Sequence, residues 1–290
     1  MLAPEQIKVK LKEAARSLGF ADLRVCPAAD FSEAKADRLR AWLGAGMFDK
    51  MEYLRRGAEA KISPQKFLEG AKSAVCVCAS FWRESPERRV ALYAQGRDYH
   101  GVIKPKLAAL AKILEGEGFR ARSSVDSSPL WEKPLAARAG LGWIGKNTLL
   151  TREENGAWNF LGVVLTDAEL PPDSPVPNRC GSCMECVKAC PTGAIGPRGI
   201  DARRCVSNLT IERRGDLTDE EKRLAAGKIF GCDECLRACP FGKNVRIPPM
   251  AEFSSFVSLP ENPSQDDILS AAKGTPMERK FKKNPNKRVE

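Results

Sequence analysis

The sequence CGSCMECVKACP, residues 180–191, places four cysteines in the spacing Cys-x2-Cys-x2-Cys-x3-Cys-Pro. A second run, CDECLRACP at residues 232–240, has three cysteines in a related spacing, and Cys205 lies between the runs. This spacing is close to that of two-cluster bacterial ferredoxins, in which the fourth cysteine of a run binds the other [4Fe–4S] cluster. The sequence therefore predicts two [4Fe–4S] clusters. Cluster 1 would be bound by Cys180, Cys183, Cys186 and Cys239, and cluster 2 by Cys190, Cys205, Cys232 and Cys235.

Zinc is the main alternative for these cysteines, because paired Cys-x2-Cys motifs are also zinc ligands. A zinc ribbon, however, has no use for a third cysteine in each run or for two Cys-Pro steps. A disulfide framework is typical of secreted proteins, and this chain shows no secretory signal, so we expect reduced thiols and a cytoplasmic location. The remaining cysteines, Cys26, Cys76 and Cys78, are predicted to be core residues, since free cysteine is often buried.

Bulk composition favours a globular enzyme-sized chain with a basic surface. The 290 residues carry a formal net charge of +10, and residues 278–290, ERKFKKNPNKRVE, read as a flexible basic arm. Such a charge suits a polyanionic partner, with nucleic acid the usual one, or belongs to a merely solvated surface. No apolar run approaches about 18 residues, so we expect no membrane span.

Hydrophobic periodicity predicts an α+β protein with three parts: a mixed α/β domain at residues 1–170, a ferredoxin-like domain at 171–250, and an extension with the basic arm at 251–290. Helices are predicted at residues 6–18, 31–43, 102–117, 129–139, 219–226 and 265–272. Strands are predicted at residues 73–81, 120–125 and 159–166. Ser127 or Ser128 is the expected cap of the helix at 129–139.

Three polar segments of the first domain do not read as core: GRDYH at residues 96–100, VDSSP at 125–129 and AGLGWIGKN at 139–147. Asp126 lies where a strand ends and a helix begins, which suits either a catalytic carboxylate or a helix N-cap. The glycines of the third segment allow close approach to a flat ligand or a phosphate, or simply form a tight loop. His100 is the only histidine, which excludes sites built from several histidines.

Together these segments resemble the epoxyqueuosine reductase family. The matching segments are residues 51–54, 70–73, 96–100, 125–129, 139–147, 180–195, 201–205 and 231–235. Many ferredoxins share the cysteine runs, whereas GRDYH, VDSSP and AGLGWIGKN together are more particular to this family. The resemblance implies an oxidoreductase that completes queuosine biosynthesis by reducing an epoxide on a modified wobble base of tRNA to an alkene.

The resemblance also implies cofactors and residue roles. The first domain would bind base-off cobalamin on a scaffold related to nitroreductases and reductive dehalogenases, and the clusters would reduce the cobalt toward Co(I), one electron at a time. Asp126 matches the family's proton donor and would have to be held protonated through burial against the corrin. Substrate contacts are expected from Arg97, Tyr99 and His100, and corrin contacts from Ser207, Asp233, Glu234, Lys146 and Asn147. An ordinary surface or loop contact is an equal alternative for each of these eight.

Two other functions stay open on the sequence: a related corrinoid reductase acting on a small molecule such as an organohalide, and a ferredoxin-like electron-transfer protein. The expected partners are tRNA containing epoxyqueuosine and a low-potential donor such as flavodoxin or ferredoxin, with the protein a monomer. Members of the family commonly continue into a C-terminal helical-repeat domain that grips tRNA, and this chain ends near the point where that domain would begin. The basic arm and core, a partner protein, or a different substrate would each account for this short form.

Overall fold

The computed structural model of this protein describes residues 2–213, 217–225, 227–255 and 257–283. The part before residue 170 is built on an antiparallel sheet with strand order β1-β2-β6-β3. Its strands are β1 (Asp22–Pro27), β2 (Ser73–Ser80), β3 (Ala121–Ser124) and β6 (Asn159–Thr166), and β4 (Trp143–Ile144) and β5 (Leu150–Thr151) form a separate hairpin. Its helices are α1 (Pro4–Ser17), α2 (Glu33–Gly44), α3 (Glu52–Arg56), α4 (Ala58–Ile62), α5 (Tyr99–Gly116) and α6 (Glu132–Arg138), with 3-10 turns at Pro64–Lys66 and Leu92–Ala94.

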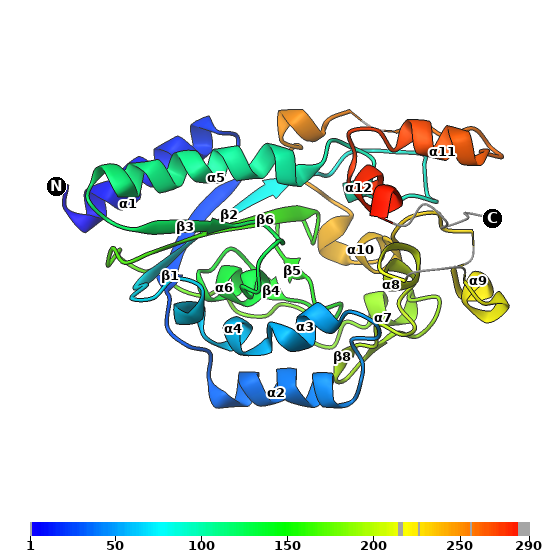
Figure 1. Cartoon of the computed structure of the whole chain (residues 1–290), viewed down its shortest axis with the longest axis horizontal. Coiled ribbons are helices and arrows are strands. Elements are labelled where there is room, and N and C mark those ends of the chain that lie inside the picture. Colours follow the sequence, from blue (N-terminus) through cyan, green and yellow to red (C-terminus); the bar gives the residue numbers. More distant parts are fainter. Residues whose placement is uncertain (1, 214–216, 226, 256, 284–290) are drawn as a thin grey trace.

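Strand β2 is a central strand of the sheet, which has helices on both faces, and it is buried at every position. Alternate side chains of a strand point to opposite faces of its sheet. Val75 and Val77 accordingly pack with α1 and α5, whereas Cys76 and Cys78 pack on the other face together with Cys26 and the buried side of α6. Figure 1 shows α1 and α5 covering one face of the sheet and α6 lying under the other. The prediction that these three cysteines are core residues is confirmed.

Strand β1 was not predicted from the sequence. It is an edge strand in which buried and partly exposed residues alternate, so it lacks the continuous apolar run that marks β2. Pairing with β2, in which Val25 lies opposite Val75, stabilises β1 as a strand despite this weak local signal. An edge strand of this kind depends on its neighbour more than on its own composition.

The helix predicted at residues 129–139 begins at Glu132, and its N-cap is Trp131. Neither Ser127 nor Ser128 caps it, and the N-cap alternative for Asp126 is also wrong. Residues 125–131 instead form a loop between β3 and α6. The separation matters because it leaves the Asp126 carboxyl available for other contacts.

The second part of the chain carries the cysteine runs on short helices, as Figure 1 shows on the side opposite the N-terminus. Its elements are α7 (Glu185–Lys188), β7 (Ile195–Gly196), β8 (Gly199–Ile200), α8 (Val206–Ile211), α9 (Asp219–Ala225), α10 (Glu234–Arg237) and a 3-10 turn at Pro240–Gly242. The predicted helix at 219–226 is confirmed over residues 219–225, while residue 226 lies outside the described residues. Its capping box is formed, because Thr218 Oγ1 accepts from the N–H of Glu221 at 3.2 Å and Glu221 Oε2 accepts from that of Thr218 at 2.8 Å.

The C-terminal arm predicted to be flexible is in part a helix. A 3-10 turn at Ala251–Phe253, α11 (Gln265–Ala271) and α12 (Pro276–Lys283) follow the ferredoxin-like part. Met277 and Phe281 lie four residues apart on α12, and both are buried against Val90 and Phe230. The many Lys and Arg residues around Met277 and Phe281 masked this apolar face in the sequence pattern. Residues 284–290 of the predicted arm lie outside the described residues.

Replacing Met277 with alanine is expected to lower the free energy of unfolding by about 2–5 kcal/mol, because deleting a buried side chain loses its transfer energy and leaves a cavity. Met277 is 0% exposed, whereas Leu269 on α11 is 43% exposed and serves as the control. Leu269→Ala should change the unfolding free energy by less than about 0.5 kcal/mol. Urea denaturation of both variants measures the difference, and equal effects would show that α12 does not support the core.

The observed architecture is of the predicted α+β class. The domain limits at residues 170 and 250 stay predictions. No helix in the described ranges is long and apolar enough to cross a membrane.

Candidate functional site

The four cysteines assigned to cluster 1 lie near one another. Partial burial raises the pKa of the Cys186 thiol, and the nearby thiols of Cys239, Cys180 and Cys183 raise it further. The N–H of Cys183 donates to the carbonyl of Cys180 at 2.9 Å, which closes the first turn of the run. Cys239 comes from the second run and is brought to the first by the packing of α10 on α7. The fold therefore assembles the predicted set across 60 residues of sequence.

The four cysteines assigned to cluster 2 line a single small cavity. Cys190, Cys205, Cys232 and Cys235 share it with the apolar side chains of Ile195, Ile200 and Val206. Burial raises the pKa of Cys235 far above its ordinary value, and Cys232 and Cys205 add to this effect. The cavity thus brings together cysteines from three separate stretches of the chain.

The chemistry of these donors fits iron–sulfur clusters. Each group offers four thiols and no histidine, and thiolate sulfur is the usual ligand of a [4Fe–4S] cluster. The raised pKa values of Cys186 and Cys235 mean that cluster binding would release protons from these two thiols. Among the described residues, no three His, Cys, Asp or Glu side chains converge on a point that could hold one metal ion. Four thiolates that each bind a different iron need not converge in that way. The division of the cysteines between two clusters stays a prediction.

Asp126 occupies a left-handed backbone conformation, with φ of 49°, on an exposed loop. Its Oδ2 accepts a hydrogen bond of 2.6 Å from the hydroxyl of Tyr99, at the start of α5. Its backbone N–H donates to Glu132 Oε1 at 2.7 Å, and Ser124 Oγ donates to the same oxygen at 2.7 Å. Glu132 therefore holds the loop that carries Asp126. A non-glycine residue in this backbone region is held there by its surroundings at an energetic cost.

Glu132 was not identified from the sequence. Burial raises the pKa of Glu132 to about 7, opposed by the hydrogen bond from Ser124 and supported by the negative charge of Asp126. The only available signal was an acid in the first turn of a helix beside a candidate catalytic residue, and that is a common position for a glutamate.

The Glu132→Gln variant is expected to lose part of the pH dependence of stability. A carboxyl with a raised pKa binds its proton more tightly in the folded state, so its contribution to stability falls as pH rises from 4.5 to about 7. The upper limit of this effect is on the order of 3 kcal/mol. Unfolding free energies of both proteins, measured across this window, should differ by a pH-dependent amount. A constant difference would contradict the prediction.

Only part of the GRDYH segment, residues 96–100, lies beside Asp126. Tyr99 stacks on Phe160, with ring centroids 4.5 Å apart and an angle of 14°, and on His100 at 4.1 Å and 29°. His100 Nδ1 lies 2.8 Å from Asp98 Oδ1, and this contact holds the pKa of Asp98 below its usual range. Arg97 is exposed, and its charge acts on Glu252. Of the three predicted substrate residues, the structure brings Tyr99 into contact with Asp126.

Further groups surround Asp126 that the sequence did not indicate. Burial raises the pKa of Tyr93, and the Asp126 carboxylate raises it further. Tyr53 is an exposed side chain, and partial desolvation of its phenol together with the Asp126 carboxylate raises its pKa as well. Burial lowers the pKa of Lys133, and Asp126 opposes this shift. Three tyrosines and a lysine from separate elements thus lie near one carboxyl.

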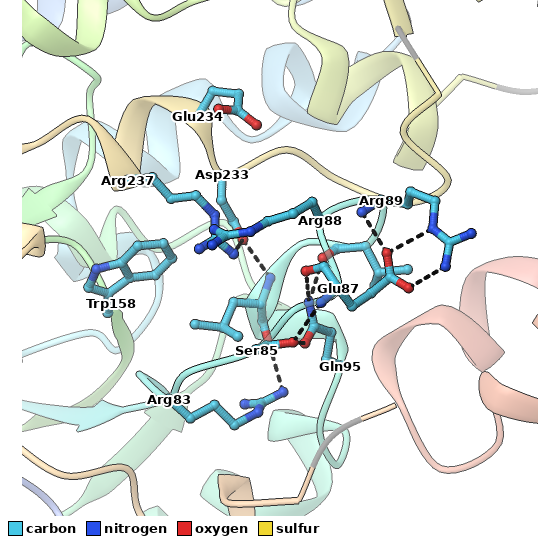
Figure 2. Close-up of polar contacts among 12 residues, drawn as sticks. Arg83, Ser85, Glu87, Arg88, Arg89, Gln95, Trp158, Asp233, Glu234 and Arg237 are labelled. Atoms are coloured by element: carbon cyan, nitrogen blue, oxygen red, sulfur yellow. Dashed lines mark hydrogen bonds and ion pairs between the residues drawn. The ribbon is translucent and has the colours of Figure 1, made fainter. Parts of the chain in front are cut away.

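Asp233, predicted together with Glu234 to contact the corrin, connects the second cysteine run to the first domain (Figure 2). Asp233 Oδ2 accepts from the N–H of Leu92 at 2.7 Å and lies 3.7 Å from Arg237. Burial raises the pKa of Asp233 to about 6. Glu234 pairs with Lys228 at 2.7 Å. Both carboxylates have protein partners here, and their contact with a corrin stays a prediction.

Residues 83–95, which include the Leu92 that contacts Asp233, are held by a network of hydrogen bonds that Figure 2 also shows. Arg83 is buried and donates to the carbonyls of Phe81, Phe253 and Leu92 at 3.0–3.3 Å. Ser85 Oγ donates to Gln95 Oε1 at 2.6 Å. These bonds turn residues 83–95 into an ordered connection between β2 and the second cysteine run.

The other predicted corrin contacts are placed as follows. Lys146 lies against the first cysteine run, where its Nζ donates to the carbonyls of Gly181 and Cys183 at 2.8 and 2.7 Å. Asn147 is buried, and its Oδ1 accepts from the N–H of Leu149 at 3.3 Å within the β4–β5 loop. Ser207 is half-buried in the first turn of α8.

Two family models match the chain. One, described as a 4Fe-4S double cluster binding domain, covers residues 179–242, and the other, described as Epoxyqueuosine reductase QueG, DUF1730, covers residues 61–127. The epoxyqueuosine reductase of Aliivibrio fischeri is 37% identical over 281 residues, which cover 92% of this chain and 74% of that protein.

Solved structures of the same name share the fold. An epoxyqueuosine reductase with a tRNA-Tyr epoxyqueuosine-modified tRNA stem loop has a TM-score of 0.75 at 32% identity, covering 86% of this chain and 69% of that one. The enzyme from Bacillus subtilis, with its catalytic Asp loop swung out of the active site, has a TM-score of 0.74 at 31% identity, covering 85% and 68%.

Proposed function

We propose that this chain, which belongs to the epoxyqueuosine reductase family, reduces epoxyqueuosine to queuosine at the wobble position of tRNA. The observation that carries the proposal is the combination, in one chain, of two groups of four cysteines with an exposed carboxyl held by Tyr99 at 2.6 Å. The first feature suits electron delivery and the second suits proton delivery. A reduction of an epoxide needs both.

The cofactors of the proposed reaction are two [4Fe–4S] clusters and base-off cobalamin. When bound, the clusters supply single electrons and the corrin supplies a low-potential cobalt centre for the epoxide. The residues near Asp126 fit a corrin. Tyr93 and Tyr99 are partly exposed aromatic rings packed against the buried Phe160, and Tyr93 lies 6.4 Å from Phe230 beside the second cysteine run. Asn208 Oδ1 is buried without a partner in the described part of the chain and would accept from a corrin amide.

The proton chemistry falls to Asp126. Conversion of an epoxide to an alkene consumes two electrons and two protons, breaks both C–O bonds, and releases water. The oxygen gains negative charge as the first C–O bond opens, so an acid must stand within hydrogen-bond reach. Tyr99 donates a hydrogen bond to Oδ2 of Asp126, so Oδ1 is the oxygen that would deliver a proton to the substrate.

The net charge of +10 supports the proposed tRNA substrate, because Lys and Arg side chains neutralise phosphates. We also propose an external low-potential donor such as flavodoxin or ferredoxin, a monomeric state, and a cytoplasmic location where tRNA is modified. Binding to tRNA should weaken steeply as salt rises, since phosphate contacts release counterions.

Turnover on modified tRNA tests the proposal. The protein is reconstituted with iron, sulfide and cobalamin without oxygen, and then given a strong reductant and tRNA containing epoxyqueuosine. Mass spectrometry of the nucleosides should show queuosine only when cobalamin is present. Absence of queuosine from protein with bound corrin and intact clusters would overturn the proposal and favour a small-molecule substrate.

A further inference from the structure

The glycine-rich segment at residues 139–147 contacts the first cysteine run through a tryptophan. Trp143 is only 4% exposed, and its Nε1–H donates to the sulfur of Cys180 at 3.4 Å. The same indole meets the ring of Phe241 edge-on, with centroids 5.0 Å apart and an angle of 79°. Phe241 lies two residues after Cys239. One side chain from the first domain therefore contacts a predicted ligand of cluster 1 and packs beside another.

Lys146 adds a positive charge to the same loop. Besides the carbonyls of Gly181 and Cys183, its Nζ lies 3.5 Å from the sulfur of Met184. The ammonium group is thus anchored within the turn that carries Cys180 and Cys183. Its position is set by at least two backbone acceptors rather than by an exposed carboxylate.

Local packing explains why these two side chains are held so firmly. A Cβ atom at Gly142 would lie 2.2 Å from the carbonyl oxygen of Thr151, so only glycine allows this β4–β5 pairing. Asn178 connects the hairpin to the cysteine run, because its Nδ2 donates to the carbonyl of Ile144 at 3.1 Å and its Oδ1 accepts from the N–H of Cys180 at 2.9 Å. The hairpin and the run are therefore positioned together.

We propose that Trp143 and Lys146 raise the reduction potential of cluster 1. A hydrogen bond to a ligating sulfur and a nearby positive charge both stabilise the reduced, more negative state of a cluster. The first-domain segment at 139–147 would then act as a positioning and tuning element for the cluster. The inference rests on the proposed ligand set of cluster 1, and it needs neither corrin nor tRNA.

Redox titration of the reconstituted protein tests this inference. Trp143→Phe keeps an aromatic ring against Phe241 and removes the N–H donor, and Lys146→Met removes the charge with a similar length of side chain. Trp131→Phe is the matched control, because Trp131 packs edge-on against Phe31 at 5.3 Å in the first-domain core. Each potential is followed by electron paramagnetic resonance and visible absorbance, with iron counted beforehand.

Both test variants should lower the potential of one cluster and leave the other unchanged, while Trp131→Phe changes neither. Unchanged potentials in Trp143→Phe and Lys146→Met would overturn the inference. If Trp143→Phe fails to hold the cluster, Lys146→Met decides alone: a downward shift supports the inference and no shift overturns it. A wild-type protein that binds no iron would instead contradict the cysteine assignment, which distinguishes that failure from this one.

Discussion

Replacing Asp126 with asparagine is expected to reduce turnover of epoxyqueuosine in tRNA by about 10²- to 10⁴-fold, the usual contribution of a general acid. Asparagine keeps the size of the side chain, and its carbonyl oxygen can still accept the hydrogen bond that Tyr99 donates at 2.6 Å. The backbone N–H bond to Glu132 is also unaffected. The variant therefore removes the transferable proton and little else. Single-turnover product formation with prereduced protein measures the loss directly.

The control for this variant is Asp37→Asn, which changes an exposed carboxylate on α2 paired with Arg40. It should leave turnover within a factor of about 2, as expected for a surface substitution. Cluster content and corrin uptake are measured for both proteins. Full turnover by Asp126→Asn with both cofactors bound would remove Asp126 from the mechanism and leave the proton to another group near the substrate.

Replacing Cys186 with alanine is expected to abolish reduction and to lower the iron content to about half, because a cluster lacking one thiolate ligand is not retained. Cys186 lies among Cys180, Cys183 and Cys239. Its loss should therefore leave iron binding by the four cysteines of cluster 2, which line a separate cavity, unchanged. Since cluster binding contributes to folding, the variant should also unfold at a lower temperature. Iron and sulfide analysis after reconstitution measures the first effect.

Cys26→Ala is the matched control, because Cys26 is a fully buried cysteine of the sheet core. It should keep its full iron content. Equal iron in both variants would show that Cys186 is no ligand. Zinc bound in place of iron, and lost only from Cys186→Ala, would favour the alternative metal for these cysteines.

The strongly patterned elements were predictable from local sequence. The buried run of β2 and the long apolar stripe of α5 carry their own signals, because each must bury a continuous surface. Other elements depended on neighbours. Strand β1 needs β2 beside it, and α12 shows its apolar face only when Met277 and Phe281 meet Val90 and Phe230.

The candidate site divides in the same way. Cysteine spacing predicts a cluster, because the ligands in one run must lie within bonding distance of the irons and this restricts their spacing in the sequence. Asp126 was identified by its place after a strand and by the family resemblance. Glu132, which holds its loop, and Trp143, which contacts Cys180, have no such spacing, because each meets its partner through the fold.

The sequence by itself determined the kind of chemistry: seven cysteines in two runs, with Cys205 between them, for electrons, and Asp126 after a strand for a proton. These follow from residue types and spacings that any fold must respect. Only the tertiary structure decided which side chains contact Asp126 and the cysteines. Tyr99 and Glu132 reach Asp126 from two helices, and Lys146 and Trp143 reach the first cysteine run from a hairpin, because long-range packing alone sets the distances on which hydrogen bonds and charge effects depend.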